Sequence, residues 1–129
     1  AALEVLLKDP DCDVNQATND GLTPAYIAAA KGQTTSLGVL VEAPGCDLNQ
    51  PTNDGLTPAF IAAMEGHTAA LELLVEAPGC DLNQPTGDGR TPAFVAAMEG
   101  HTAALELLAE APGCDLNQAT DNGRTPAYI

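Results

Sequence analysis

The sequence predicts an all-α solenoid of stacked helix-turn-helix units with projecting loops that contain β-turns. One stretch, residues 54–63, recurs with little change at positions 20 and 88 and, cut short, at position 122, so the step is 34 residues each time. Each unit holds two helix-forming runs and one segment rich in turn-forming residues. A period of 20 to 50 residues is typical of solenoids, whose units bury their apolar faces against their neighbours.

The first helix of each unit is expected to begin at a Thr-Pro pair, such as Thr57 and Pro58. The threonine hydroxyl can accept a hydrogen bond from an early backbone N–H, and proline suits the first helical position, where an N–H is not needed. An apolar run follows as far as Met64, and Gly66 can take the positive φ of a C-cap. This helix is therefore expected to be about two turns long.

The second helix is expected over about residues 68–77, because this run is rich in Ala, Leu and Glu and is followed by a Pro-Gly pair that ends it. Residues 80–89 come next and are rich in Asp, Asn, Pro and Gly. They are expected to form a long projecting loop, with Gly89 in the left-handed region of backbone space.

The pattern Gly-x-Thr-Pro-Ala-x-x-Ala-Ala-x-x-Gly-His, followed by a Leu-Leu helix and by Gly-Cys-Asp-Leu-Asn, resembles the ankyrin repeat along the whole chain. The resemblance implies an ankyrin-type solenoid. Where the family commonly has Leu-His after Thr-Pro, this chain has Ala and an aromatic residue, namely Tyr26, Phe60, Phe94 and Tyr128. The imidazole that would bond the threonine hydroxyl is therefore missing. The family period is commonly 33, and the extra residue is assigned to Pro44, Pro78 and Pro112.

The repeat predicts one array over residues 1–129, without a second domain. Its expected units are a partial repeat at 1–19, complete repeats at 20–53, 54–87 and 88–121, and a partial repeat at 122–129. Residues 1–12 are expected to form the second helix of the first partial unit. Neither end has the polar capping repeat that usually closes such arrays, so we expect the chain to be a segment of a longer array.

The charge of the chain bears on its partners and its location. Eighteen acidic residues against four basic ones leave a formal net charge of −14, which repels phosphates and disfavours nucleic acids and anionic membranes as partners. No apolar run has the length of a membrane span. The compartment is not determined; expected reduced cysteines and the lack of an Asn-x-Ser/Thr site favour an intracellular location slightly.

The four cysteines fall at the same point of each unit: Cys12, Cys46, Cys80 and Cys114. Stacked helical units lie about 10 Å apart, whereas a disulfide requires Cα atoms within about 7 Å. We therefore expect buried, reduced thiols that act as small apolar residues. The same spacing disfavours a zinc site, whose ligands must converge on one point.

No residue pattern predicts catalysis, a cofactor or a metal site. His67 and His101 follow a helix-ending Gly and are expected to bridge the turn between the two helices of their unit. A catalytic role would need a nucleophile or second base nearby, and none is specified. The oxygen-rich stretch 47–55 resembles a calcium loop in composition, but the EF-hand spacing fails, and Asx-type bonding to the loop backbone is the alternative.

The resemblance also implies a contact surface, because partners of ankyrin arrays usually meet the loop tips and the exposed side of the first helices. Carried onto this sequence, the predicted partner-binding residues are Asn19, Asp20, Leu22, Lys31, Asn53, Asp54, Leu56, Met64, Glu65, Gly87, Asp88, Arg90, Met98 and Glu99. Neighbouring units differ at several of these positions, as variable surface sites would. Met64 and Met98 are either apolar anchors on this surface or part of the core.

Two functions fit these features. The first is a non-catalytic scaffold that binds a partner protein through the loop tips and first helices, and variable loop tips favour it. The alternative is a structural array that forms a long rod or filament by end-to-end stacking, and the similarity of units 54–87 and 88–121 favours that. The paired glutamates of the second helix, such as Glu72 and Glu76, form either a solvated outer face or an acidic stripe that steers a basic partner.

Overall fold

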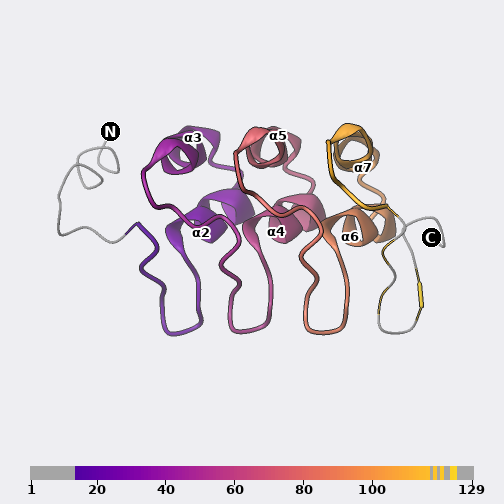
Figure 1. Cartoon of the computed structure of the whole chain (residues 1–129), viewed down its shortest axis with the longest axis horizontal. Coiled ribbons are helices and arrows are strands. Elements are labelled where there is room, and N and C mark those ends of the chain that lie inside the picture. Colours follow the sequence, from indigo (N-terminus) through magenta and orange to yellow (C-terminus); the bar gives the residue numbers. More distant parts are fainter. Residues whose placement is uncertain (1–13, 117, 119, 121–122, 125–129) are drawn as a thin grey trace.

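The computed structural model of the chain describes residues 14–116, 118, 120, 123 and 124. Within these residues the fold is all-α: six short helices follow one another in pairs, and no strand occurs among them (Figure 1). The helices are α2 (Pro24–Lys31), α3 (Thr34–Glu42), α4 (Pro58–Glu65), α5 (Thr68–Glu76), α6 (Pro92–Met98) and α7 (Thr102–Glu110). The predicted helix at 1–12 lies outside the described residues.

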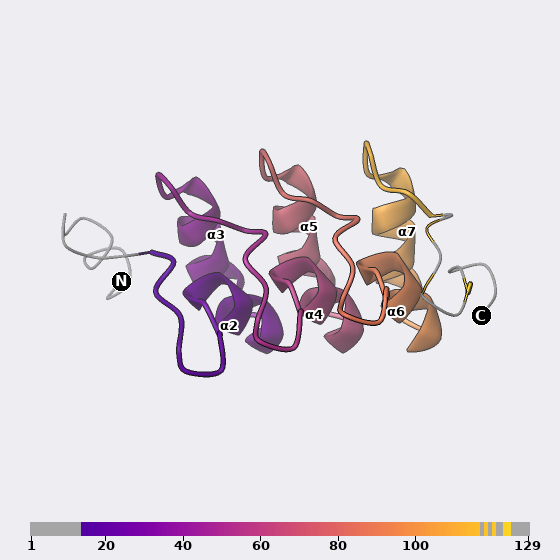
Figure 2. The ribbon, with the colours of Figure 1, turned by 60° about the horizontal axis from the view of Figure 1, so that its bottom comes forward.

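The helix pairs stack in two rows to form a solenoid. The first helices of the units, α2, α4 and α6, pack in series, and so do the second helices, α3, α5 and α7. Each first helix also packs against the second helix of its own unit. The loops that join the units project together from one side of the array, as Figures 1 and 2 both show. The predicted helix-turn-helix solenoid is thus confirmed.

The Thr-Pro pair begins each first helix as expected. The Oγ1 atom of Thr57 accepts a hydrogen bond from the backbone N–H of Phe60 at 3.2 Å, and Pro58 occupies the first turn. Thr23 and Thr91 cap α2 and α6 in the same way. All three threonines are buried, and this hydrogen bond satisfies each hydroxyl without the imidazole of the common family pattern.

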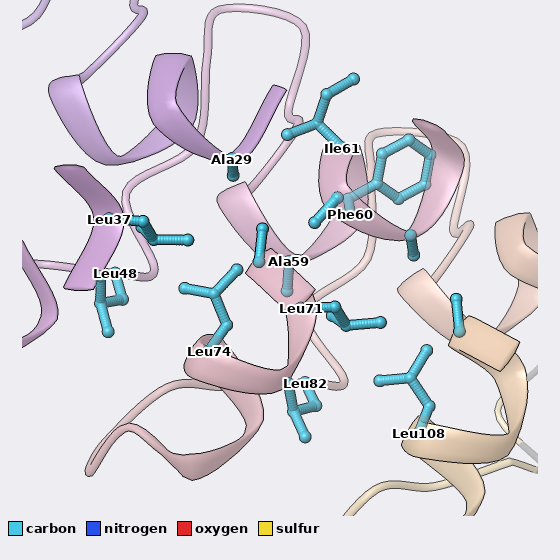
Figure 3. Packing of buried hydrophobic residues seen from close by; sticks show 14 of the residues in the cluster. Ala29, Leu37, Leu48, Ala59, Phe60, Ile61, Leu71, Leu74, Leu82 and Leu108 are labelled. Carbon is cyan, nitrogen blue, oxygen red and sulfur yellow. The ribbon is translucent and has the colours of Figure 1, made fainter. Parts of the chain in front are cut away.

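The core is one continuous layer between the two rows of helices. Buried leucines of the second helices, among them Leu37, Leu71 and Leu108, meet buried alanines of the first helices (Figure 3). Burying each leucine side chain contributes about 1.5–3 kcal/mol. Small residues such as Ala62 and Ala63 are fully buried and let neighbouring helices approach closely. The short two-turn helices are therefore stabilised by contacts between units more than by their own propensity.

Candidate protein-binding face

The loops that join the units are built from the same few backbone hydrogen bonds. In the loop between the first and second complete units, Thr52 donates its N–H to the oxygen of Leu56 at 2.9 Å, and Gly55 donates to the oxygen of Thr52 at 2.9 Å. The bonds of Thr86 with Arg90 and Gly89 repeat this arrangement at 2.8 and 2.9 Å. Gly89 has φ 86°, which confirms its predicted left-handed conformation. The loops are therefore hairpin-like projections of similar geometry.

Adjacent loop tips contact each other directly. Asn53 donates its backbone N–H to the oxygen of Asp20 at 3.1 Å and its side-chain Nδ2 to the oxygen of Asn19 at 2.9 Å. The backbones approach so closely that a Cβ atom on Gly21 would lie 2.7 Å from the nitrogen of Asn53. In the next loop Gly87 replaces Asn53 and has no side-chain amide to form this link.

The predicted partner-binding residues lie on the loops and on the ends of the first helices, and most of them are exposed. We call this surface the loop-tip face. Its exposed members are Asn19, Asp20, Lys31, Asn53, Asp54, Glu65, Gly87, Asp88, Met98 and Glu99, and its half-buried members are Leu22, Leu56, Met64 and Arg90. No partner is present, so a binding role for these residues stays a prediction.

The two methionines do not belong fully to the core. Met64, at the end of α4, is half-buried and packs against the core cluster, whereas Met98, at the end of α6, has 40% of its surface exposed. Both methionines therefore present some apolar surface at a helix end, and the next residue in the chain is in each case an exposed glutamate, Glu65 or Glu99.

Arg90 is held by two neighbouring units at once. Its Nε atom lies 3.0 Å from a carboxylate oxygen of Asp88, and its guanidinium carbon lies 5.8 Å from the ring centroid of Phe60, within the range of a cation–π contact. The hydroxyl of Thr86 donates a hydrogen bond to Asp88. This hydrogen bond and, to a smaller degree, Arg90 lower the pKa of the Asp88 carboxyl.

Tyr26 occupies the position in the first unit that Phe60 occupies in the second. Burial raises the pKa of Tyr26, and the nearby carboxylates of Glu65 and Asp54 raise it further. Two acidic groups from different elements of the second unit, the end of α4 and a loop tip, therefore lie near one aromatic side chain of the first unit.

A ladder of asparagines joins the units below the loops, and inspection of the sequence did not identify it. Asn49 donates Nδ2 to the oxygen of Gly79 at 2.8 Å and accepts at Oδ1 from the backbone N–H of Asp81 at 2.6 Å. Asn15 and Asn83 form the same bonds to the following units. The predicted Asx-type bond is present as well, from the N–H of Asn49 to Asp47. The recurrence of Asp-x-Asn at one point of every unit was the available signal.

His67 bridges the turn of its own unit through its backbone, whose N–H donates to the oxygen of Ala62 at 2.9 Å, but its side chain bonds to the preceding unit, which the sequence did not predict. Its Nε2 atom lies 3.1 Å from the backbone oxygen of Ala30 in the preceding unit. The ring packs against Gly32, where a Cβ atom would lie 2.9 Å from its Nδ1 atom. His101 packs in the same manner against Gly66. The histidines therefore join neighbouring units, because the stacking of the units brings each ring beside the preceding helix end.

The cysteines within the described residues are reduced but only half-buried. Cys46, Cys80 and Cys114 form no disulfide and pack against the edge of the core, as expected of reduced thiols that act as small apolar residues, but their burial is only partial. They lie in the loop after each second helix, where one side faces solvent. Burial raises the pKa of Cys80 to about 11, with a smaller contribution from Asp81.

Metal ligands do not gather in the described part of the chain, where no group of three or more His, Cys, Asp or Glu residues is placed to hold a metal ion. No described helix is long and apolar enough to cross a membrane. The glutamates of the second helices, including Glu72, Glu76 and Glu106, are exposed, and these helices carry no Lys or Arg.

Helix pairs that stack in two rows, with a series of similar loops along one side, define a helical-repeat solenoid. The chain belongs to the ankyrin-repeat family: a model described as ankyrin repeats in three copies matches residues 1–86, and a model of a single ankyrin repeat matches residues 88–118. No curated protein matches the chain. Ankyrin repeats are generally protein–protein interaction modules.

Proposed function

We propose that this chain is a non-catalytic scaffold that binds a partner protein through the loop-tip face. The supporting observation is where the units differ. On the loop-tip face Leu56 is replaced by Arg90 and Asn53 by Gly87, whereas the ladder residues Asn49 and Asn83 are asparagine at both junctions. Residues on the loop-tip face therefore vary from unit to unit, while the asparagine ladder that joins the units does not. This pattern is expected if the chemistry of the face is adapted to a partner.

The partner is proposed to be a protein, because the net charge of −14 opposes phosphate-rich ligands.

Selection from a displayed library of random linear peptides tests the proposal. We expect the chain to enrich peptides whose binding is weakened by the face variant Met64→Asp and unchanged by Glu72→Gln on the outer helix α5. Failure to enrich any peptide, or equal binding by both variants, would contradict the use of this face.

A structural rod is the second candidate. The observation that favours it is that the asparagine bonds and the histidine packing recur from one junction to the next, so they set no limit to the number of units. Electron microscopy of the native full-length protein separates the candidates. Discrete particles favour the scaffold, and long filaments with an axial repeat of about 10 Å favour the rod.

A further inference from the structure

The dipeptide Asp-Gly recurs at the same point of three loop tips, at Asp20, Asp54 and Asp88. In this dipeptide the carboxyl group can react with the amide nitrogen of the glycine, because glycine has no Cβ atom to hinder the approach. All three aspartates are exposed, and each following glycine donates its N–H to the oxygen of a threonine three residues earlier, at 2.9 Å. Exposure and the turn itself therefore do not distinguish the three sites.

Asp88 is restrained through its side chain. Its carboxylate accepts a hydrogen bond from the hydroxyl of Thr86 and lies 3.0 Å from the Nε atom of Arg90. These contacts must break before the carboxyl carbon can reach the glycine nitrogen. The Thr86 hydrogen bond and, to a smaller degree, Arg90 also lower the pKa of the Asp88 carboxyl, so less of it is in the acid form that can lose water.

Asp20 is restrained through its backbone. Its carbonyl oxygen accepts the N–H of Asn53 at 3.1 Å, and the side chain of Asn53 also binds the oxygen of Asn19 at 2.9 Å. Rotation about the Cα–C bond of Asp20 would turn the glycine nitrogen toward the carboxyl group, and it would turn this carbonyl oxygen as well. The reaction at Asp20 therefore requires the bond from the next loop to break.

Asp54 has neither restraint. Leu56 occupies the position of Arg90, and Gly87 occupies that of Asn53. In the part of the chain that the structure describes, neither the carboxylate nor the carbonyl oxygen of Asp54 accepts a hydrogen bond, and the carboxylate forms no ion pair. What remains is the turn bond of the following glycine, which all three loops share.

We propose that Asp54 is the loop-tip aspartate that converts to isoaspartate in the folded protein. The amide nitrogen of Gly55 attacks the Cγ atom of the protonated carboxyl group, so that an N–C bond forms, a C–O bond breaks and water leaves with the amide proton. Water then opens the succinimide ring at either carbonyl group and gives aspartate or isoaspartate. No oxidant or cofactor is consumed. This inference does not rest on the scaffold function, although the product lengthens the backbone within the loop-tip face.

The test is incubation of the intact folded protein at neutral pH, followed by site-specific peptide mapping. Endoprotease Asp-N cleaves before aspartate but not before isoaspartate, and electron-transfer dissociation identifies the isomer. The mapping must be site-specific because the Asn122-Gly123 pair can form the same ring. We expect isoaspartate to form first at Asp54, and about tenfold more slowly at Asp88, because a charge-assisted hydrogen bond must break there before the reaction. In denaturant the three sites should react at similar rates.

Variants of the chain test each restraint. Leu56→Arg should slow the reaction at Asp54, because it supplies the guanidinium that Arg90 supplies to Asp88. Gly87→Asn should slow it too, by restoring the amide that links the loop tips; Gly87 has no positive φ, and a Cβ atom there would meet no described atom within 4 Å. In the reverse direction, Arg90→Leu should speed the reaction at Asp88. Asp54→Glu is the chemical control and should abolish it, because the ring would need an additional carbon atom.

The results that would overturn the proposal are specific. Equal rates at the three sites of the folded protein would do so, as would a faster rate at Asp20 or Asp88. Absence of isoaspartate at Asp54 when the denatured chain has formed it at all three sites would also contradict it. Unchanged rates at Asp54 in both the Leu56→Arg and Gly87→Asn variants would show that these restraints do not control the reaction.

Discussion

At the scale of single residues, short polar side chains join the units of this array. The side-chain amide of Asn49 donates to one backbone group of the next unit and accepts from another, which no aliphatic side chain can do. His67 adds a contact across the same junction on the side of the first helices. These residues recur because each junction presents the same backbone groups to be satisfied.

Replacement of Asn49 by Ala should lower the free energy of unfolding by about 1–3 kcal/mol, since two hydrogen bonds across the junction are lost and their partners are left to solvent. Denaturant unfolding followed by circular dichroism measures this. Asn19→Ala is the matched control, because the exposed Asn19 side chain forms no hydrogen bond in the described structure. Equal stability of the two variants would show that the asparagine bonds do not hold the junction.

Cys80 should react slowly with iodoacetamide in the folded protein. Its pKa is raised from 9.0 to about 11, so the reactive thiolate at pH 8 is reduced about a hundredfold. The unfolded thiol ionises first as pH rises, so this group contributes stability that is present below about pH 9 and is lost toward pH 11. Peptide mass spectrometry gives the alkylation rate. Equal rates with and without denaturant would contradict the expected protection.

At the scale of elements, each first helix begins at a threonine and a proline, and at the ends of α2 and α4 a glycine in the left-handed region supplies the C-cap. The glycines have a second role that depends on stacking. Gly32 and Gly66 leave room for an imidazole of the following unit. A Cβ atom on Gly100, by contrast, would meet no described neighbour within 4 Å.

Gly32→Ala and Gly100→Ala separate these two roles. Both residues have positive φ, 67° and 74°, so each substitution should cost about 1–2 kcal/mol in backbone strain. At Gly32 the methyl group would also displace the His67 ring from Ala30, and this should add about 1–3 kcal/mol. Thermal and denaturant unfolding measure the difference. A Gly32→Ala variant no less stable than Gly100→Ala would mean that the ring moves aside without cost.

At the scale of the whole molecule, stability should be a sum of unit terms and junction terms, as in other one-dimensional arrays. The described core is continuous, but each helix packs mainly against the equivalent helices of the neighbouring units and against the other helix of its own unit. No single unit is therefore the centre on which the fold depends.

Deletion of residues 54–87 should lower the unfolding midpoint and keep the helix content per residue. The deletion brings the first unit against the third, whose His101 can pack on Gly32 as His67 does. Circular dichroism with thermal unfolding checks both quantities. Complete loss of helix would contradict the additive stability of a solenoid.

The sequence by itself determined the architecture of this protein. A period of 34 residues, Thr-Pro starts such as Thr57-Pro58 and glycine ends such as Gly66 are local signals, and local signals predict helices and turns because caps and φ restrictions act within a few residues. The positions of the loop-tip residues followed from the same pattern, although their binding role is still a prediction.

Only the tertiary structure decided which residues meet across the junctions. The asparagine ladder, the contact of His67 with Ala30 and the position of Arg90 over Phe60 join residues about one unit apart in the chain. Such contacts depend on how far one unit is shifted and rotated relative to the next. That geometry is set by the packing of leucines against alanines in the shared core, and no local sequence signal encodes it.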